Sequence, residues 1–402
     1  MKVAIIGQGY VGLPLSMAIS SAGHEVVGFD LNIQIVKSLG EGISHVEDIP
    51  NSELSAALKT GKYIASSNPK DLENVEIAIV AVPTPLGEDR QPDLNFVESA
   101  SEILGKNLKK AALIINESTS YPGTLRNVIA PIVMQNSKLN HLFAISPERV
   151  DPGNKKWGIR NTPRLISGMT PEAGRKTAEF YSSFCDQVIE VSSPEVAESA
   201  KLFENTFRQV NIALVNELAL ICNKLGISAH EVLDAANSKP YGFMKFTPGI
   251  GVGGHCIPVD PTYLAYAAKS VGAEARFIEM ANEVNLSMPK ELVKRIKQDN
   301  GNTLKGKKIV VYGIAYKPDI ADYRESPSLA LISLLRNEGA LVSWHDPIVQ
   351  NWSSEQSCAL SPDIFDIGVA AIIHHTMNKD DLKSASKYLI DCTGKIEGAI
   401  TF

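Results

Sequence analysis

The sequence predicts an α/β protein in which two α/β domains are joined by a long helix, and three observations predict it. Short apolar runs alternate with helical patterns over about the first 190 residues, which is typical of a parallel sheet. An uninterrupted helical pattern follows, from Pro194 to Leu225. The segment KGKKIVVYGIAYKPD, which begins at Lys305, then repeats the strand-and-glycine pattern with which the chain opens.

The composition is that of a globular protein with several domains. The chain has 402 residues, of which 44% are hydrophobic and 21% charged, and a single core rarely serves more than about 250–300 residues. The net charge of −6, with no basic run to offset it, disfavours nucleic acid or an anionic membrane as a partner. No apolar run reaches membrane-spanning length and no signal-peptide pattern is present, so we expect a cytoplasmic protein. The five scattered cysteines exclude a paired-cysteine zinc site and disfavour a disulfide framework, and we expect no bound metal.

The first domain contains six candidate strands, each a short apolar run separated from the next by a helical pattern. They are Lys2–Ile6, Glu25–Phe29, Ile77–Val82, Ala112–Ile115, Leu142–Ile145 and Val188–Val191.

The long helix has signals for both of its ends. Ser192 and Ser193 are potential N-caps, Pro194 suits the first helical turn, and Gly226 offers a C-terminal stop. About 32 residues at about 1.5 Å each make a helix on the order of 48 Å long. A helix of that length commonly bridges two domains or forms a dimer interface.

The remaining chain contains a helical region and a second α/β pattern. Helical patterns cover His230–Ala236 and about Pro261–Gln298, and Asp299–Asn302 is typical of a linker. After it, LVSWHDP, AAIIHH and KYLIDC are candidate strands. We therefore expect three parts: residues 1–192, 193–298 and 299–402.

A glycine-rich turn follows the first strand. Gly7-Gln8-Gly9-Tyr10-Val11-Gly12 opens a helical pattern, and in this context the glycines bring a pyrophosphate close to the helix N-terminus. Asp30 ends the second strand, where a carboxylate accepts hydrogen bonds from ribose hydroxyls and repels a 2′-phosphate. Leu31 and Asn32 supply no cation to offset that repulsion, so NAD is favoured over NADP. The alternative is an empty glycine turn in a structural α/β unit.

Two threonines follow other strand ends that face the same crevice. Thr84 lies in Val82-Pro83-Thr84-Pro85 and Thr119 lies in Glu117-Ser118-Thr119. Because the carboxyl ends of parallel strands meet at one edge of the sheet, these hydroxyls could contact the cofactor. They could equally be helix caps.

Two further sites have both a functional and a structural interpretation. Lys201 and Asn205 lie four residues apart on the long helix and so share a face, which is usually a solvated one. Neighbours such as Leu202 and Phe203 leave little of this helix exposed, and a lysine on a largely buried helix needs a purpose. Glu148 follows the strand Leu142–Ile145 and could be a general base or a surface loop residue.

The segment PGIGVGGHCIPVDP, from Pro248 to Pro261, is too rich in glycine and proline for a helix interior or a central strand. Its backbone N–H groups suit an oxyanion, and Cys256 within it is accessible as a nucleophile toward an aldehyde carbon. Asp260 could hold a water or a lysine. Together with a dinucleotide site, this loop predicts oxidation of an alcohol or aldehyde to an acid through a thiohemiacetal and a thioester.

These motifs, in their order and spacing, resemble those of the UDP-glucose/GDP-mannose dehydrogenase family. The matching segments are GQGYVGLPL, VPTP, ESTSYPGT, SPERVDPGN, AKLFENTFRQVNIALVNELA, PGIGVGGHCIPVDP and GIAYKPDIADYRES, which cover nearly the whole chain. The resemblance implies two Rossmann-like domains joined by a long central helix, the second domain binding the nucleotide, and a homodimer through that helix. It also implies oxidation of C6 of a UDP-sugar by two NAD⁺ without release of the aldehyde.

The resemblance implies a role for each motif residue. Cys256 resembles the nucleophile, and Lys201, helped by Asn205, resembles the cation that stabilises developing oxyanions. Asp260 resembles the carboxylate that orders the catalytic water, and Glu148 resembles the acid/base residue of thioester hydrolysis. The cofactor set that it implies is Gly7, Gly9, Tyr10, Val11, Gly12, Asp30, Thr84, Thr119 and Arg324. The substrate set is Glu148, Arg149, Val150, Lys201, Asn205, Arg208, Phe246, Gly253 and Lys317, of which Arg149 and Arg208 could also be surface charges.

The same motifs imply the class of sugar. SPERVDPG and GGHCIPVDP resemble the branch that acts on UDP-N-acetylhexosamines, and they most resemble enzymes for UDP-N-acetylglucosamine. UDP-N-acetylmannosamine and UDP-glucose are the alternatives. Two positions depart from the family: Ile35 stands where many members carry Lys or Arg, and Thr393 stands where an Asp-x-Arg has its arginine. Weaker cofactor or nucleotide binding is implied, unless Lys395 replaces that arginine.

Two other functions fit part of the sequence. A two-electron hydroxyacid dehydrogenase would use a helix lysine and asparagine, but it needs no cysteine, so the GGHC loop weighs against it. A catalytically silent nucleotide-sugar binding protein would need none of the five candidate catalytic residues. Their joint presence weighs against that function.

Overall fold

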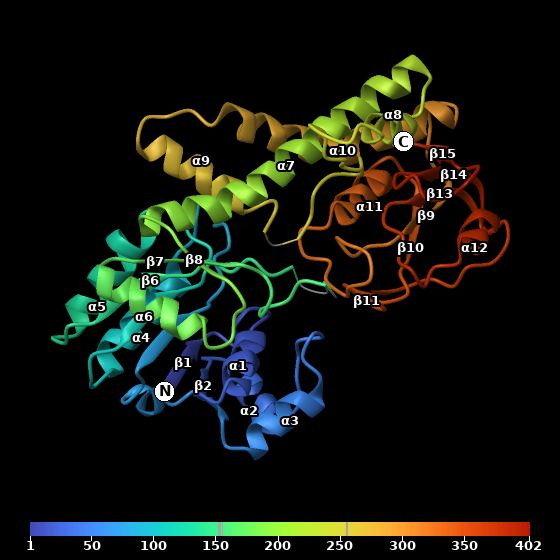
Figure 1. Ribbon diagram of the computed structural model, residues 1–402. Helices are drawn as coiled ribbons and strands as arrows, with labels where there is room; N and C mark the ends of the chain where they lie inside the picture. The colour runs from blue at the N-terminus through green and yellow to red at the C-terminus, as the bar shows by residue number, and fades with distance from the viewer. Residues whose placement is uncertain (152–153, 155, 255) are drawn as a thin grey trace. The chain divides into compact units, whose positions relative to one another are not determined.

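The structure is a computed structural model and describes residues 1–151, 154, 156–254 and 256–402. Its contacts divide the chain into two compact units, each with its own sheet and apolar core. The first unit comprises 1–204 and 262–272, and the second comprises 205–261 and 273–402. Figure 1 shows α7 (Pro194–Leu225) as one unbroken helix, and its residues contribute to both units.

The first unit has an eight-stranded sheet in the order β3-β2-β1-β4-β5-β6-β7-β8. The order 3-2-1-4-5-6 within it is that of a Rossmann fold. The pairings of these strands are parallel, as the pattern predicted, except that β6 pairs with β7 in the antiparallel direction. The strands are β1 (Lys2–Ile6), β2 (Glu25–Phe29), β3 (Tyr63–Ser66), β4 (Ile77–Val80), β5 (Leu113–Asn116), β6 (Leu142–Ile145), β7 (Arg164–Gly168) and β8 (Val188–Glu190).

All six strands expected before the long helix are present, with ends shifted by no more than two residues. The pattern missed β3 and β7. Helices and turns connect the strands: α1 (Gly12–Ser21), α2 (Ile33–Gly40), α3 (Asn51–Lys59), a 3₁₀ turn (Pro69–Leu72), α4 (Asn95–Asn107), a π-helical turn (Leu125–Ile129), α5 (Ala130–Asn136) and α6 (Pro171–Tyr181). No helix in the described part of the chain is both long and apolar enough to cross a membrane.

The central helices confirm the long helix and correct the pattern that follows it. α7 has the predicted bounds, and Gly226 after it takes a φ of +72°. Ser228 then caps α8 (Ala229–Asn237) by accepting from the Glu231 N–H. The single pattern expected over residues 261–298 is wrong, because α9 (Asp260–Ser270) and α10 (Arg276–Asp299) are separate helices. Gly272 lies between them with a φ of +75°, which ends a right-handed helix.

The second unit has a five-stranded parallel sheet in the order β10-β9-β13-β14-β15. Its strands are β9 (Lys308–Tyr312), β10 (Leu341–His345), β13 (Phe365–Ala370), β14 (Ser386–Asp391) and β15 (Ile400–Thr401), and its helices include α11 (Pro327–Asn337) and α12 (Lys379–Ser384). A separate hairpin pairs β11 (Asn351–Trp352) with β12 (Glu355–Gln356).

One strand of this unit was misplaced by the sequence pattern. AAIIHH, residues 370–375, was expected to be a strand, but β13 ends at Ala370 and the rest is loop. Ala371 and Ile373 are nevertheless buried, because this loop packs against the turn after β9. An added Cβ on Gly313 would lie 2.3 Å from the Ile372 carbonyl oxygen. Burial in a loop thus produces the same apolar pattern as a strand.

Candidate active site

The turn after β1 is shaped by three glycines. Gly7 takes a φ of +96° and its N–H donates to the Phe29 carbonyl at 2.8 Å. An added Cβ would lie 2.5 Å from the Ala81 carbonyl oxygen at Gly7 and 1.8 Å from the Gly7 carbonyl oxygen at Gly12. At Gly9 a Cβ would meet nothing within 4 Å. Gly7 and Gly12 are therefore needed for packing, whereas Gly9 leaves open space in which a pyrophosphate can approach the start of α1.

The carboxylate of Asp30 holds this turn from the end of β2. Its Oδ2 accepts from the Gln8 N–H at 2.9 Å and its Oδ1 from the Asn32 N–H at 2.8 Å. Each oxygen keeps lone-pair capacity for a ribose hydroxyl, and Asp30 is only partly buried. Tyr10, 45% exposed, and Val11 complete the turn. These residues fit a dinucleotide with an unmodified ribose.

The two threonines follow strands but cap no helix. Thr84 is buried and Thr119 is partly buried. The N-cap residues of the helical segments that follow are Leu94 and Thr124. The interpretation of Thr84 and Thr119 as helix caps is therefore wrong, and their contact with the cofactor stays a prediction.

A buried carboxylate on α7 holds the loop that carries Thr119. Glu198 is 1% exposed, and its oxygens accept from the N–H groups of Gly123 at 2.6 Å and Leu125 at 3.1 Å. Burial raises the pKa of Glu198 to about 7, although these two N–H groups act to lower it. Lys201 follows on the next turn of α7 and is partly buried. The first turns of α7 are thus tied to the loop after β5.

Not all of α7 is as buried as the sequence suggested. Phe203 is 63% exposed and Phe207 is 43% exposed, so the expectation that these neighbours cover the helix is wrong. Arg208 is also exposed. Asn205, by contrast, is 9% exposed, and Leu202 is fully buried.

Glu148 belongs to a buried cluster of charges. One of its carboxylate oxygens accepts from the N–H groups of Arg149 and Val150, and the other lies 3.5 Å from Nη1 of Arg164. The same Nη1 donates to Glu117 at 3.1 Å. Burial raises the pKa of Glu117 to about 7, although Arg164 beside it acts to lower that pKa. Glu148 is therefore held at a fixed position by a guanidinium that two carboxylates share.

Neighbouring side chains complete this cluster. The Tyr181 hydroxyl donates to Glu117, and the Arg164 guanidinium lies 5.2 Å from the centre of the Tyr181 ring. Arg149 donates to Glu204 and to the Pro163 carbonyl at 2.7 Å. Its substrate contact, like that of Val150, stays a prediction.

The Cys256 loop joins two other candidate residues. Cys256 is exposed and is not part of a disulfide, and its carbonyl accepts from the Asp260 N–H at 2.8 Å. Asp260 begins α9, is 2% exposed, and accepts from Asn205 Nδ2 at 2.5 Å. The structure therefore brings Asn205, Cys256 and Asp260 together. His255, part of the same motif, lies outside the described residues, as do Pro152, Gly153 and Lys155 of the other substrate motif.

The other side of this loop packs on the segment after β9. An added Cβ on Gly253 would lie 2.7 Å from Cβ of Tyr316, and the Gly254 N–H donates to the Arg324 carbonyl at 3.1 Å. Arg324 is exposed, and its guanidinium bonds to Asp322. Lys317, partly buried, follows Tyr316. The Cys256 loop thus contacts the segment that carries Lys317, predicted to bind the substrate, and Arg324, predicted to bind the cofactor.

Phe246, a predicted substrate contact, packs against α7. The rings of Phe246 and Phe207 lie 5.8 Å apart at a steep angle.

The structure also places the two residues that depart from the family pattern. Ile35 of α2 stands where many members carry Lys or Arg, and it packs against the apolar core. Thr393 donates through its N–H and hydroxyl to Asp391, whereas Lys395 is exposed.

A buried carboxylate in the second unit organises the segment before Lys317. Asp346, 0% exposed, follows β10 and accepts from four backbone N–H groups: those of Ile314, Ala315, Ile348 and Val349. His374 Nε2 lies 3.1 Å from the same carboxylate, and His374 Nδ1 lies 2.8 Å from the Asp319 nitrogen. Since an N–H only donates, Nδ1 accepts and Nε2 carries the hydrogen. His374 therefore bridges Asp346 to the segment that carries Lys317.

We expect Asp346→Asn to lower the free energy of unfolding by about 2–4 kcal/mol at pH 7. The backbone N–H groups and His374 would then face a neutral amide in place of the carboxylate. Burial alone would raise the pKa of Asp346, but bonds from His374 and the Val349 and Ile348 N–H groups lower it from 3.8 to about 2. A lowered carboxyl pKa stabilises the fold above pH about 4, and that contribution is lost as the pH falls towards 2. The melting temperatures of wild type and variant should therefore converge between pH 7 and pH 3. Asp363→Asn, at an exposed position, is the control; equal gaps at both pH values would contradict the prediction.

The sequence motifs missed the residues that support the candidate site. Glu117, Arg164, Tyr181 and Glu198 are buried polar groups that contact candidate residues or their loops. Only Glu117 and Glu198 lie inside segments that the sequence singled out, and a charged residue in an apolar context was the available signal. No group of three or more His, Cys, Asp or Glu in the described ranges is arranged to hold a metal ion.

Comparison with known families gives three matches that follow one another along the chain. The profiles are those of the UDP-glucose/GDP-mannose dehydrogenase family. Its NAD binding domain matches residues 1–185, its central domain residues 195–287, and its UDP binding domain residues 310–393.

Individual relatives are similar over most of their length. A UDP-N-acetyl-D-glucosamine 6-dehydrogenase of Pseudomonas aeruginosa is 36% identical over 90% of this chain and 86% of its own. A UDP-N-acetyl-D-mannosamine dehydrogenase of Campylobacter jejuni is 36% identical over 84% of each chain. The solved structure of a UDP-D-ManNAc dehydrogenase from Pyrococcus horikoshii is 30% identical, with a TM-score of 0.88 over 100% of this chain and 98% of that one.

Proposed function

This chain belongs to the UDP-glucose/GDP-mannose dehydrogenase family, and from that premise we propose that it oxidises C6 of UDP-N-acetylglucosamine to a carboxylate. The family consists of NAD-dependent nucleotide-sugar dehydrogenases, so NAD is the cofactor and a UDP-sugar the substrate. The choice of sugar rests on the SPERVDPG and HCIPVDP motifs and on the similarity to the Pseudomonas aeruginosa enzyme. UDP-N-acetylmannosamine is the alternative, favoured by the Campylobacter jejuni relative, which is also 36% identical.

The observation that carries the proposal is the bonded set of Asn205, Asp260 and Cys256. The Asp260 carboxylate is 2% exposed and bonded to Asn205, while its own N–H holds the Cys256 carbonyl. A buried carboxylate four residues after a nucleophilic cysteine, bonded to it through the backbone, is suited to orient a water toward a thioester. A two-electron hydroxyacid dehydrogenase has no use for this arrangement.

The reaction balances as two hydride transfers and one hydrolysis. In the first transfer the C6 alcohol loses a proton from oxygen and a hydride from carbon to the bound NAD, which gives the aldehyde. The Cys256 thiolate adds to that aldehyde to form a thiohemiacetal. Its hydroxyl then loses a proton and its C6 transfers a second hydride to a second NAD⁺, which would have to replace the NADH, and a thioester results. Water then cleaves the C–S bond, releasing the acid and the thiol. We assign oxyanion stabilisation to Lys201 and Asn205, and acid/base work in hydrolysis to Glu148.

The stoichiometry of NADH tests this proposal. The protein is incubated with NAD⁺ and, separately, with UDP-N-acetylglucosamine, UDP-N-acetylmannosamine, UDP-N-acetylgalactosamine and UDP-glucose, and NADH is counted per sugar consumed. The proposal requires about two NADH per sugar, because each hydride transfer yields one. A ratio near one, or no turnover with any sugar, would sink it. The highest kcat/KM identifies the sugar, and a preference for the mannosamine would replace the glucosamine assignment.

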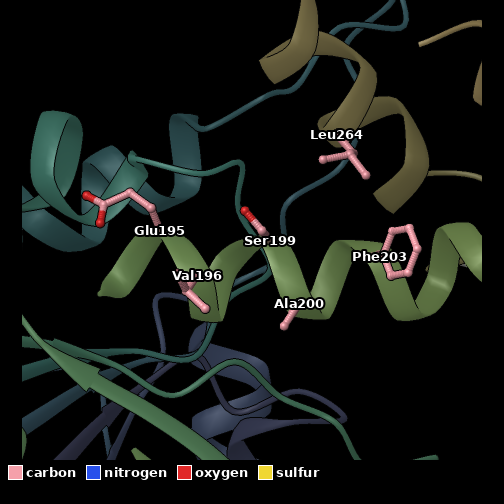
Figure 2. A pocket seen from close by; sticks show the side chains of 6 residues that line it. All are labelled: Glu195, Val196, Ser199, Ala200, Phe203 and Leu264. Atoms are coloured by element: carbon pink, nitrogen blue, oxygen red, sulfur yellow. The ribbon is translucent and has the colours of Figure 1, made fainter. Parts of the chain in front are cut away.

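We also propose a homodimer through α7. Six exposed apolar side chains recur along this helix at spacings of seven and four residues, which places them on one stripe. They are Val196, Phe203, Phe207, Leu214, Ile221 and Leu225, each at least 43% exposed. Figure 2 shows part of this surface, an open hollow of about 480 Å³ with Phe203 of α7 on one side and Leu264 of α9 on the other. A second copy is the partner that a helical stripe of this periodicity fits.

Leu214→Glu should convert the dimer to a monomer, because it buries a charge at the centre of the stripe. Light scattering after size-exclusion chromatography measures the mass directly. Leu341→Glu is the matched control, since Leu341 is 60% exposed but lies in β10. If Leu214→Glu and wild type have the same mass, α7 is not the interface.

We also propose a cytoplasmic location and a division of the chain into three functional parts. The five cysteines are outside disulfides, which suits the reducing cytoplasm. We assign residues 1–192 to NAD binding, 193–298 to the helical connector with the Cys256 loop, and 299–402 to UDP-sugar binding. Cell fractionation tests the location, and the binding of UDP to an isolated fragment tests the division.

A further inference from the structure

Two buried asparagines lie beneath the beginning of the Cys256 loop, and we propose that they are positioning residues that hold the thiol in its reactive place. Asn216 lies on α7 and is 0% exposed, and Asn285 lies on α10 and is 5% exposed. Both belong to the same unit as Cys256. The inference rests on the nucleophilic role proposed above for Cys256.

A chain of three hydrogen bonds runs from the loop through both side chains. The Gly249 N–H donates to Asn216 Oδ1 at 2.9 Å, and Asn216 Nδ2 donates to Asn285 Oδ1 at 2.9 Å. Asn285 Nδ2 then donates to the Gln209 carbonyl of α7 at 3.2 Å. Gly249 lies seven residues before Cys256, and residues 249–254 form no helix or strand. The chain therefore fastens the beginning of the loop to two helices.

The two ends of this chain fix the direction of every bond in it. A backbone N–H can only donate and a backbone carbonyl can only accept. Asn216 must therefore turn its oxygen toward Gly249, and Asn285 must turn its NH₂ toward Gln209. Neither aspartate nor leucine can replace either asparagine, because each would leave a buried donor or acceptor without a partner. These bonds therefore hold Gly249 in one position, and they do so only while both asparagines are present.

The helix backbone supplies a second contact at the same place. Pro289 lies inside α10 and has no N–H, so it cannot make the helical hydrogen bond to the Asn285 carbonyl four residues before it. Gly251 of the loop, with a φ of +127°, lies against that carbonyl. An added Cβ on Gly251 would be 2.8 Å from the Asn285 oxygen. Asn285 thus supports the loop through its side chain and through its backbone.

The test is Asn216→Leu, which keeps the approximate volume and removes the amide. We expect kcat to fall on the order of a hundredfold, the loss that a displaced reacting group can cause. The rate at which iodoacetamide alkylates Cys256, followed by peptide mass spectrometry, should differ from wild type by about threefold or more. Binding of NAD⁺ should stay within about twofold of wild type, since the turn after β1 is untouched. Asn211→Leu is the matched control, because Asn211 Nδ2 bonds the Phe207 carbonyl of its own helix and not the Cys256 loop as far as the structure describes it.

The outcomes separate positioning from stability alone. A folded Asn216→Leu enzyme with a lower melting temperature, but with wild-type kcat and alkylation rate, overturns the proposal. Should that variant fail to fold, Gly251→Ala tests the loop side of the contact against Gly249→Ala, whose Cβ would meet nothing within 4 Å. Equal activity and alkylation in those two variants also overturns it. Because alkylation needs no turnover, it still tests the positioning role if no UDP-sugar is oxidised.

Discussion

A Cys256→Ser enzyme should lose sustained NADH production by about a thousandfold or more, because residues that act as one catalytic unit cannot be removed singly at small cost. Serine is a far weaker nucleophile than a cysteine thiolate at neutral pH, because its hydroxyl stays protonated there. Binding of NAD⁺ should be unchanged, since the Gly7–Gly12 turn and Asp30 belong to the other unit. Steady-state absorbance at 340 nm and calorimetric NAD⁺ titration measure the two quantities.

The control for this variant is Cys358→Ser. Cys358 is a partly buried free thiol elsewhere in the second unit, and its replacement should leave turnover intact. Mass spectrometry of wild type quenched during turnover should find the sugar attached to the peptide with Cys256. Undiminished turnover of Cys256→Ser would show that the cysteine is not the nucleophile, whatever the fate of the substrate assignment.

Arg164→Met should lower the free energy of unfolding by about 3–5 kcal/mol, because it leaves a buried carboxylate without its cation. Glu117 is 0% exposed and lies 3.1 Å from the lost guanidinium, and Glu148 lies 3.5 Å from it. Burial already raises the pKa of Glu117 from 4.5 to about 7. A raised carboxyl pKa costs stability increasingly as the pH rises from about 4.5 to 7. Urea unfolding should therefore show a larger loss at pH 8 than at pH 5.

Two further variants test the cause of this loss. Glu117→Gln combined with Arg164→Met removes both charges and should be more stable than Arg164→Met alone. Arg160→Met is the surface control, since the Arg160 side chain is 83% exposed and pairs with the exposed Asp186; this variant should unfold like wild type. A pH-independent loss, or a double variant no more stable than the single one, would contradict the role of the charge.

Much of the fold was predictable because its signals are local. Each of the six expected strands of the first unit is a short apolar run, and α7 is bounded by Pro194 and Gly226. The two missed strands lack that signal. β3 (YIAS) is short and mixed, and β7 begins with Arg164, whose burial depends on Glu117, 47 residues earlier in the chain. A charged residue in a sequence is therefore predicted to lie on the surface unless its buried partner is already known.

The candidate site was predictable to the extent that its residues lie in motifs. Cys256, Asp260 and Asn205 were proposed separately, and the structure brings them into one bonded set. The supporting residues could not be found in this way, because an asparagine such as Asn216 resembles any polar helix residue in a sequence. Its function depends on a proline in another helix and a glycine in a loop, which only the tertiary fold combines.

The turn after β9, which Asp346 holds, has the same backbone geometry as the turn after β1. Gly313 and Gly7 each follow the first strand of a unit and take a positive φ, and each N–H donates to the carbonyl of the last residue of the parallel neighbouring strand. Asp346 and Asp30 then occupy equivalent positions after that neighbour. The chain thus contains the same glycine turn and the same aspartate position in both of its sheets.

The two copies differ in what their acid can still do. Asp30 is only partly buried and keeps acceptor capacity for a ribose, whereas four N–H groups and His374 surround Asp346 at 0% exposure. Asp346 is buried and its carboxylate already accepts these bonds, so it does not offer a ribose the accessible acceptor that Asp30 offers. We therefore expect the turn after β9 to make no contact with a dinucleotide ribose through its aspartate.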